Sequence, residues 1–400
     1  MTKNRPRYRL AVLASHPIQY QAPLFRALAA RSEIDLHVFF CHRWGAERYK
    51  DPGFGLSLSW DIPLLDGYKY TFLRNFSFRP GPTWFWGVVN PGIVLSVLGN
   101  KFDALWIHGW ALASNWMGWA TAVPRRLPVL LRGETNGLTR QAGLKGKVKK
   151  VVLKTLFSQV AGFLAIGTNN ANFYKAYGIA EERIFWTPYA VDNALFLKHA
   201  SALEGQKRSL REKEGLPPDL PVILFCGKFQ EKKRPMDLLE AFALLDWPHA
   251  ASVVFVGDGP QRPIMERFAT ERRLANVYFL GFRNQTKLPA CYAMADVLVL
   301  PSDFEPWGLV VNEAMCFGLA VIVSDQVGAA ADLVRDGVNG FIYPVGNIQS
   351  LADRLQRVLA NEQAREEMGK QSYTIINRWG FEEDIAGLLN ALHAVAGTKT

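Results

Sequence analysis

The chain has 400 residues, of which 49% are hydrophobic and 20% are charged. This length is too great for one ordinary core, and this composition excludes a disordered chain, so we expect two folded domains. The net charge of +10 is uneven, because residues 1–200 hold 25 Lys and Arg against 11 Asp and Glu, and the remainder hold 21 against 25.

Short apolar runs alternate with helical patterns along the first half. These runs predict strands at Leu10–Ser15, Leu36–Cys41, Ala104–His108, Val129–Arg132, Gly162–Ile166 and Ile184–Trp186. Helices fit between them, for example at Pro23–Ala30 and at Asn169–Tyr177, where an asparagine is suited to the N-cap. Near-continuous apolar strands separated by helices are typical of a parallel sheet covered on both faces.

The second half repeats this plan. Its predicted strands are Val222–Cys226, Ser252–Val256, Val277–Leu280, Ala295–Leu300, Gly318–Val323 and Gly340–Tyr343, with helices at Pro235–Leu245 and Arg262–Leu274. The pattern indicates an α/β protein of two Rossmann-like domains, each a doubly wound parallel sheet. A polar, Pro- and Gly-punctuated stretch suggests domains at 1–200 and 201–379, and a helix in 380–400 could pack back on the first.

The chain offers no strong sign of a membrane span or of secretion. Residues 104–124 are nearly uncharged, but they contain His108, Gly109 and Asn115 and fit a strand, a turn and a buried helix better. The apolar run after the basic N-terminus, Leu10–Ala14, is too short for a signal peptide. The four cysteines form no CxxC motif and suit buried thiols in a reducing cytosol, so we expect a cytoplasmic protein.

The basic first half also holds nine of the twelve tryptophans. Such a surface suits an anionic membrane or a lipid pyrophosphate, and a merely basic surface is the plain alternative. Nucleic acid is not expected, because no binding motif accompanies the charge. The lysine-rich stretch 144–157 could lie on an anionic membrane as a helix, peripheral to its inner face, or could pack on the sheet with a solvated lysine face.

A basic loop, Gly-Lys-Phe-Gln-Glu-Lys-Lys-Arg-Pro at 227–235, follows the strand Val222–Cys226. Ligands of open α/β folds bind at the carboxyl edge of the sheet, so Lys228 and Lys233 are candidates to neutralise a diphosphate. The alternative is a solvated charge run. After the next strand, Gly257 and Gly259 allow a sharp turn and close approach to a ligand, although glycine is common in any such turn.

Two glutamates eight residues apart, Glu305 and Glu313, flank the predicted start of a helix near residue 308. The first helical N–H groups and the positive end of the helix dipole suit phosphate oxygens, and carboxylates accept hydrogen bonds from hydroxyl groups. A nucleotide-sugar is a ligand that contains both phosphate oxygens and hydroxyl groups. Besides Glu313, the candidate donor-binding residues of this segment are Gly308, Leu309 and Val310. Glutamates at this spacing also occur by chance, but the loop context makes chance the minor explanation.

The second half resembles the nucleotide-sugar domain of family 4 retaining glycosyltransferases (glycosyl transferases group 1), which have the GT-B fold of two Rossmann-like domains facing a cleft. The resemblance rests on Gly-Lys-x4-Lys at 227–233, Val-Gly-Asp-Gly-Pro at 256–260 and Leu-Pro-Ser-x2-Glu-Pro-Trp-Gly-x4-Glu at 300–313. It implies that Glu313 holds ribose, that Glu305 lies by the sugar, and that two lysines stabilise the leaving diphosphate. No cofactor or metal is expected, since the sequence lacks an Asp-x-Asp motif.

The first half departs from the family pattern at the expected acceptor side. His16 and His108 each end a predicted strand on the same sheet edge, and a site role and a structural role are equally open. Arg132 and Glu134 stand where many relatives place a histidine. Two charges at a strand end are costly unless they are paired or used, so these residues either pair with each other or grip a substrate.

The resulting expectation is a hexosyltransferase-like enzyme that moves a sugar, with retention, from a nucleotide-sugar to a glycan or lipid-linked saccharide, in envelope polysaccharide or glycoconjugate synthesis. The alternatives are another GT-B enzyme, such as a nucleotide-sugar epimerase or a phosphorylase, and a non-catalytic nucleotide-sugar-binding protein.

Overall fold

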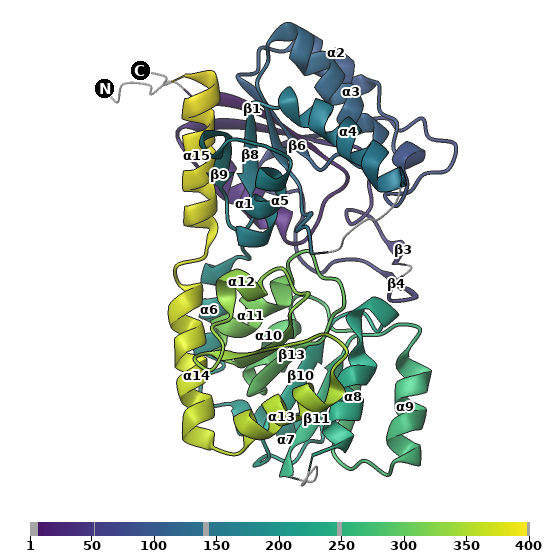
Figure 1. The fold of residues 1–400 in the computed structure, drawn as a ribbon, viewed down its shortest axis with the longest axis vertical. Coiled ribbons are helices and arrows are strands. Elements are labelled where there is room, and N and C mark those ends of the chain that lie inside the picture. The colour runs from purple at the N-terminus through teal and green to yellow at the C-terminus, as the bar shows by residue number, and fades with distance from the viewer. Residues whose placement is uncertain (1–6, 52, 139–143, 246–249, 398–400) are drawn as a thin grey trace. The chain divides into compact units, whose positions relative to one another are not determined.

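The computed structural model describes residues 7–51, 53–138, 144–245 and 250–397 (Figure 1). The chain divides into two compact units. The first contains residues 1–49, 63–189 and 381–400, and the second contains residues 50–62 and 190–380. The division thus falls at 189/190, where the sequence suggested 200/201, and the second unit includes a short segment of the N-terminal half.

The first unit is built on a seven-stranded parallel sheet of order β5-β2-β1-β6-β7-β8-β9. Its strands are β1 (Tyr8–Ala14), β2 (Ile34–Phe40), β5 (Lys69–Phe72), β6 (Ala104–His108), β7 (Val129–Arg132), β8 (Gly162–Ala165) and β9 (Ile184–Trp186). Its helices are α1 (Gln21–Ala29), α2 (Gly92–Gly99), α3 (Ala113–Ala122), α4 (Leu144–Ser158), α5 (Thr168–Ala176) and α15 (Phe381–Ala396).

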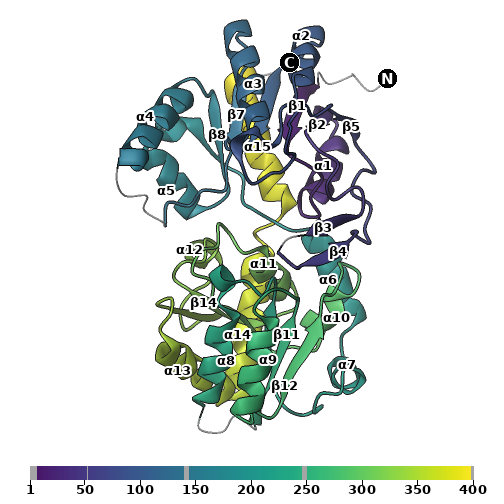
Figure 2. The same cartoon turned by 90° about the vertical axis from the view of Figure 1, so that its right-hand side faces the viewer.

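Both faces of this sheet are covered by helices (Figure 2). Alternate side chains of β1 point to opposite faces, so Leu13 packs with helices α2 to α5 and Val12 packs with α1 and α15. The C-terminal helix α15 therefore completes the core of the first unit. Burial on both faces explains why these strands are apolar at almost every position.

The second unit is built on a six-stranded parallel sheet of order β12-β11-β10-β13-β14-β15. Its strands are β10 (Val222–Cys226), β11 (Ser252–Val256), β12 (Val277–Gly281), β13 (Val297–Leu300), β14 (Ala320–Ser324) and β15 (Gly340–Tyr343). Its helices are α6 (Asn193–Ala202), α7 (Lys207–Lys213), α8 (Pro235–Ala243), α9 (Arg262–Glu271), α10 (Leu288–Ala293), α11 (Leu309–Cys316), α12 (Ala330–Leu333), α13 (Ile348–Leu359) and α14 (Glu362–Ile376). Two short strands, β3 (Tyr49–Asp51) and β4 (Leu56–Leu58), pair with each other.

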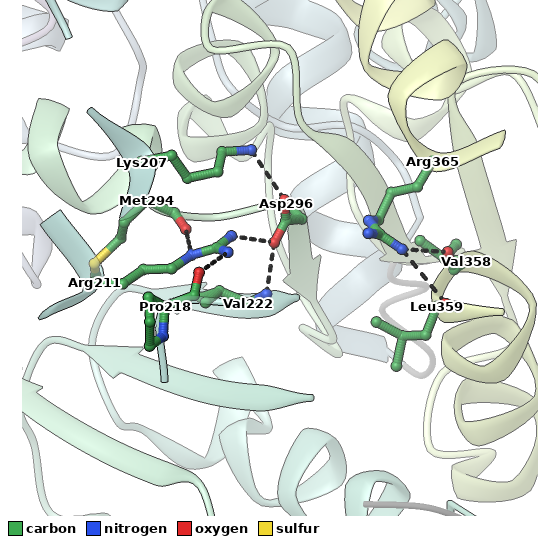
Figure 3. Close-up of polar contacts among 9 residues, drawn as sticks. All are labelled: Lys207, Arg211, Pro218, Val222, Met294, Asp296, Val358, Leu359 and Arg365. Carbon is green, nitrogen blue, oxygen red and sulfur yellow. Dashed lines mark hydrogen bonds and ion pairs between the residues drawn. The ribbon is translucent and has the colours of Figure 1, made fainter. Parts of the chain in front are cut away.

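The polar stretch that the sequence suggested as a linker is helical and anchored to the second sheet (Figure 3). Arg211 of α7 is buried and its guanidinium lies 2.5 Å from Asp296 Oδ2, just before β13. The same carboxylate oxygen accepts from the N–H of Val222 at 2.7 Å, and Lys207 contacts the other oxygen at 2.9 Å. A second buried arginine, Arg365, donates to two carbonyls at the end of α13.

Some local predictions need correction. The predicted N-cap Asn169 lies inside α5, whose N-cap is Gly167, and that cap makes no side-chain hydrogen bond. Within 144–157, the described part of α4 buries Leu153, Leu156 and Phe157, while Lys149, Lys150 and Lys154 are exposed. The buried residues suit a packed helix with a solvated lysine face, but Val151 and Val152 are exposed as well, so membrane contact stays a prediction. The side chains of residues 144–148 lie outside the described part.

Two other expectations agree with the structure. The segment 104–124 forms β6 and α3, and no helix in the described ranges has both the length and the apolar character needed to cross a membrane. The cysteines are free and buried.

Candidate functional site

Two neighbouring turns shape the carboxyl edge of the second sheet. After β10 the chain turns at Gly227, and after β11 it turns at Gly257 and Gly259, all with positive φ. The N–H of Phe229 donates to the carbonyl of Asp258 at 2.9 Å, so the two turns lie side by side. A Cβ on Gly257 would lie 1.8 Å from the carbonyl oxygen of Gly227. A Cβ on Gly259 would lie 2.6 Å from the carbonyl oxygen of Phe229, so contact between the turns requires glycine at 257 and 259, a reason that the sequence did not supply.

The first turn carries Lys228, whose ammonium forms an ion pair with Asp51. The Nζ atom lies 2.8 and 2.9 Å from the two carboxylate oxygens. Asp51 also accepts from the backbone N–H groups of Gly53 and Phe54, and the Phe54 ring lies 4.9 Å below the ammonium. Burial raises the pKa of Asp51, but Lys228 and these two N–H groups more than offset it and leave the pKa below its ordinary value. Lys228, the predicted phosphate-binding lysine, is thus already paired with the carboxylate of Asp51.

Lys233 and Glu305, predicted to serve one ligand, are brought together. The ammonium and carboxylate are in contact, and both side chains are mostly buried. The N–H of Asp303 donates to the carbonyl of Lys232 at 3.0 Å, which fixes the basic loop against the loop after β13. Burial lowers the pKa of Lys233 to about 7, and the ammonium groups of Lys232 and Lys228 contribute to the lowering.

The loop that carries Glu305 is held closely. A Cβ on Gly328 would lie 1.9 Å from the carbonyl oxygen of Pro306, so only glycine allows this approach. Trp307 is buried, its ring stacks on Trp379 with centroids 5.5 Å apart, and its Nε1 donates to Asn312 of α11 at 2.9 Å. The loop therefore leads into α11 in one fixed conformation.

Helix α11 begins where the sequence predicted it. Gly308 is the N-cap and has a φ of 100°, a backbone conformation that favours glycine. The N–H groups of Leu309 and Val310 belong to the first turn, where a helix has no acceptors of its own for them. Glu313 lies inside the helix, fully buried, and accepts from the hydroxyl of Tyr292. The structure thus places Glu305 at the helix entrance and Glu313 in the interior.

The four candidates of the first unit gather at the carboxyl edge of its sheet. His108 ends β6 directly beside Arg132, which ends β7. The Nε2 atom of Gln21 in α1 lies 2.8 Å from the Nε2 atom of His108. Burial, the Arg132 guanidinium and the ring of His16 lower the pKa of His108 to about 3. Burial and the neighbouring His42 lower the pKa of His16 to about 4. Both imidazoles are therefore neutral at pH 7.

Arg132 does not pair with Glu134, although such a pair was one of the two alternatives that the sequence left open. Its guanidinium lies 3.0 and 2.9 Å from the two oxygens of Asp384 in α15, and both side chains are buried. Glu134 instead accepts from the hydroxyl of Tyr189 at 2.9 Å. Arg132 therefore anchors the C-terminal helix to the first sheet, whereas desolvation of the Glu134 carboxyl raises its pKa above the ordinary value despite the Tyr189 hydroxyl and Arg132.

Sequence reasoning missed the partners of these residues, namely Asp51, Tyr292, Tyr189, Gln21 and Asp384. No local sequence pattern indicated these pairings. Across the described ranges, no group of three or more His, Cys, Asp or Glu side chains is arranged to hold a metal ion.

Comparisons with known proteins agree with this layout. Residues 206–375, most of the second unit, match the model of the family described as glycosyl transferases group 1. The chain is 28% identical over 305 residues to the D-inositol 3-phosphate glycosyltransferase of Xylanimonas cellulosilytica, and the match covers 72% of this chain and 71% of that protein.

Solved structures resemble the whole chain. HepE of Anabaena, in complex with UDP and glucose, matches with a TM-score of 0.72 and 18% identity, over 96% of this chain and all of HepE. Sucrose-phosphate synthase of Thermosynechococcus elongatus matches with a TM-score of 0.71 and 21% identity, over 97% of this chain and all of that one. The chain therefore has the GT-B fold, and its second unit carries the group 1 glycosyltransferase match.

Proposed function

We propose that the protein is a retaining glycosyltransferase that moves a sugar from a nucleotide-sugar to a glycan or a lipid-linked saccharide, in the synthesis of an envelope polysaccharide or glycoconjugate. The observation that carries the proposal is the grouping of Lys233, Glu305 and the first turn of α11 at one sheet edge, within the region that matches group 1 glycosyltransferases.

The chemistry follows from charge. The bond between the sugar C1 and the diphosphate oxygen breaks, and a bond from C1 to the acceptor oxygen forms. Negative charge grows on the departing nucleoside diphosphate, and Lys228, Lys233 and the N–H groups of α11 are the groups suited to stabilise it. In the retaining route the acceptor proton passes to the leaving phosphate, so no separate protein base is required.

Each remaining candidate has a distinct task in the proposal. Glu305 at the helix entrance accepts hydrogen bonds from the sugar, and Glu313 accepts from the ribose after its carboxylate exchanges the Tyr292 hydroxyl for ribose hydroxyls. In the first unit, His16, His108 and Glu134 serve the acceptor. That HepE was solved with UDP and glucose supports a nucleotide-sugar as the donor.

The test is a turnover assay with UDP-, GDP- and ADP-sugars and analysis of the anomeric configuration of the product. We expect Lys233→Ala to lower turnover by about 100-fold or more, in the range known for loss of a group that stabilises transition-state charge. Glu313→Ala should lower turnover at subsaturating donor by about tenfold, because losing the acceptor for the ribose hydroxyls raises the donor KM. Lys213→Ala, at an exposed lysine of α7, is the matched control. Unchanged turnover in the two site variants would refute the site. Formation of an epimer from donor alone would favour the isomerase alternative.

A further inference from the structure

An ordered loop of the first unit presents aromatic side chains to solvent. We call residues 74–86 the aromatic loop. It exposes Phe76, Phe78, Phe85 and Trp86, with exposed fractions of 57%, 86%, 37% and 54%. Exposed aromatic side chains this numerous on one short loop mark an interaction surface.

The loop is held in shape by its own hydrogen bonds. Asn75 Oδ1 accepts from the N–H of Ser77 at 3.0 Å and of Val89 at 2.8 Å. The N–H of Gly81 donates to the carbonyl of Gly87 at 3.1 Å, and Trp84 Nε1 donates to the carbonyl of Arg79 at 2.9 Å. The aromatic rings are therefore presented by a fixed backbone.

The surroundings of the loop are basic and apolar. Arg74 and Arg79 belong to the loop and are exposed, and no acidic residue occurs between positions 67 and 102. Helix α2, which follows directly along the chain, exposes Leu95 and Leu98, one turn apart, with exposed fractions of 73% and 44%. Aromatic and aliphatic side chains together with arginines, in a stretch of chain without acidic residues, are typical of a segment that lies in the interface of an anionic bilayer.

We propose that the aromatic loop and the exposed face of α2 dock on an anionic membrane surface, with the rings among the lipid head groups and the arginines against lipid phosphates. Charge complementarity selects this partner. A saccharide would stack on aromatic faces but gains little from exposed leucines, and a second copy of this chain would bring the same positive charge to the contact. The proposal does not depend on glycosyl transfer.

The test is co-sedimentation of the full chain with vesicles of phosphatidylcholine mixed with phosphatidylglycerol, compared with phosphatidylcholine alone. We expect binding to the anionic vesicles that weakens as salt is raised. The double variants Phe78→Ser/Trp86→Ser and Arg74→Ser/Arg79→Ser should each bind about tenfold more weakly. The control is Ile264→Ser/Tyr373→Ser, which removes two exposed apolar side chains from the second unit.

Because the substituted side chains are exposed, all variants should keep the thermal unfolding midpoint of the parent. Vesicle binding that the loop variants leave unchanged, or no binding by the parent, would overturn the proposal. So would loop variants that dissociate a dimer, or that weaken binding to a soluble oligosaccharide while vesicle binding persists.

Discussion

Lys228 and Asp51 form an ion pair inside the second unit, although they are 177 positions apart in the chain. The Lys228 ammonium, which the proposed function assigns to the donor diphosphate, is therefore already paired with the Asp51 carboxylate. Neighbouring contacts hold the same segment in place, since Asn284 donates to the carbonyl of Ser59 at 2.8 Å and the rings of Phe54 and Phe282 lie 4.9 Å apart.

If the diphosphate must displace Asp51, removing that carboxylate should help the donor. We expect Asp51→Asn to lower the KM for the nucleotide-sugar by about fivefold, which corresponds to the roughly 1 kcal/mol of a partly exposed ion pair. Steady-state kinetics at saturating acceptor measures this. Asp61→Asn, which neutralises a second carboxylate of the same segment, one that accepts from Thr286, is the control and should leave KM unchanged. A higher KM for Asp51→Asn would show that Asp51 positions Lys228 for the donor.

The lowered pKa of Lys233 predicts a pH dependence. Because this pKa is about 7 in the free protein, the ammonium is mostly charged at pH 6 and loses its charge as pH rises through 7. A diphosphate needs the charged form, so the donor KM should rise by up to about tenfold per pH unit above 7. Lys233→Arg keeps a permanent charge and should flatten the profile. A KM that rises equally in both proteins would contradict this assignment.

The contact between Gly328 and Pro306 predicts a site-specific defect. Gly328→Ala places a methyl group against the Pro306 carbonyl, so the loop that carries Glu305 must shift. We expect kcat/KM to fall by about 100-fold, as is known for displacements of about 1 Å near a reacting group. Gly99→Ala, where φ is not positive and a Cβ would meet nothing within 4 Å, is the control for adding a methyl group without a clash. Equal losses of kcat/KM in both variants would show that the defect does not come from the contact between residue 328 and Pro306.

The buried pair Arg132–Asp384 predicts an effect on stability. Removing one partner leaves an uncompensated buried charge, so Asp384→Ala should lower the free energy of unfolding by about 3–5 kcal/mol. The double variant Arg132→Met/Asp384→Leu should recover much of this loss, because an apolar pair of similar size needs no charge compensation. Chemical denaturation followed by circular dichroism measures both. A double variant no more stable than Asp384→Ala would indicate that Arg132 has a further role.

The sequence predicts the strands of both units well, and the physical reason is burial. β6 and β10 begin and end at the predicted residues, Ala104–His108 and Val222–Cys226, because both faces are covered and every position except the terminal His108 is apolar. β5, Lys69–Phe72, was not predicted, since this edge strand is largely exposed and has no apolar run. The N-cap prediction at Asn169 failed because the helix begins one residue earlier.

The candidate site was predictable in its motif residues and not in their partners. Glu305 and Gly308 lie where the loop and helix pattern put them, since those signals are local. Asp51, Tyr292 and Asp384 could not be found, because each contact joins segments distant in the chain and depends on tertiary packing. Arg132 pairs with a residue of the last helix, so its partner could not be found from the strand end at which Arg132 lies.

In the proposed function, the second unit binds a nucleotide-sugar through Lys228 and Lys233. Thermal unfolding in the presence of UDP-, GDP- and ADP-sugars tests it most directly, because a ligand at 100 times its Kd stabilises the folded state by about 2.7 kcal/mol. We predict that one of these donors raises the melting temperature of the parent and of Lys213→Ala, and that Lys228→Ala/Lys233→Ala abolishes the rise. A rise of equal size in the double variant, or none with any nucleotide-sugar, would contradict the claim.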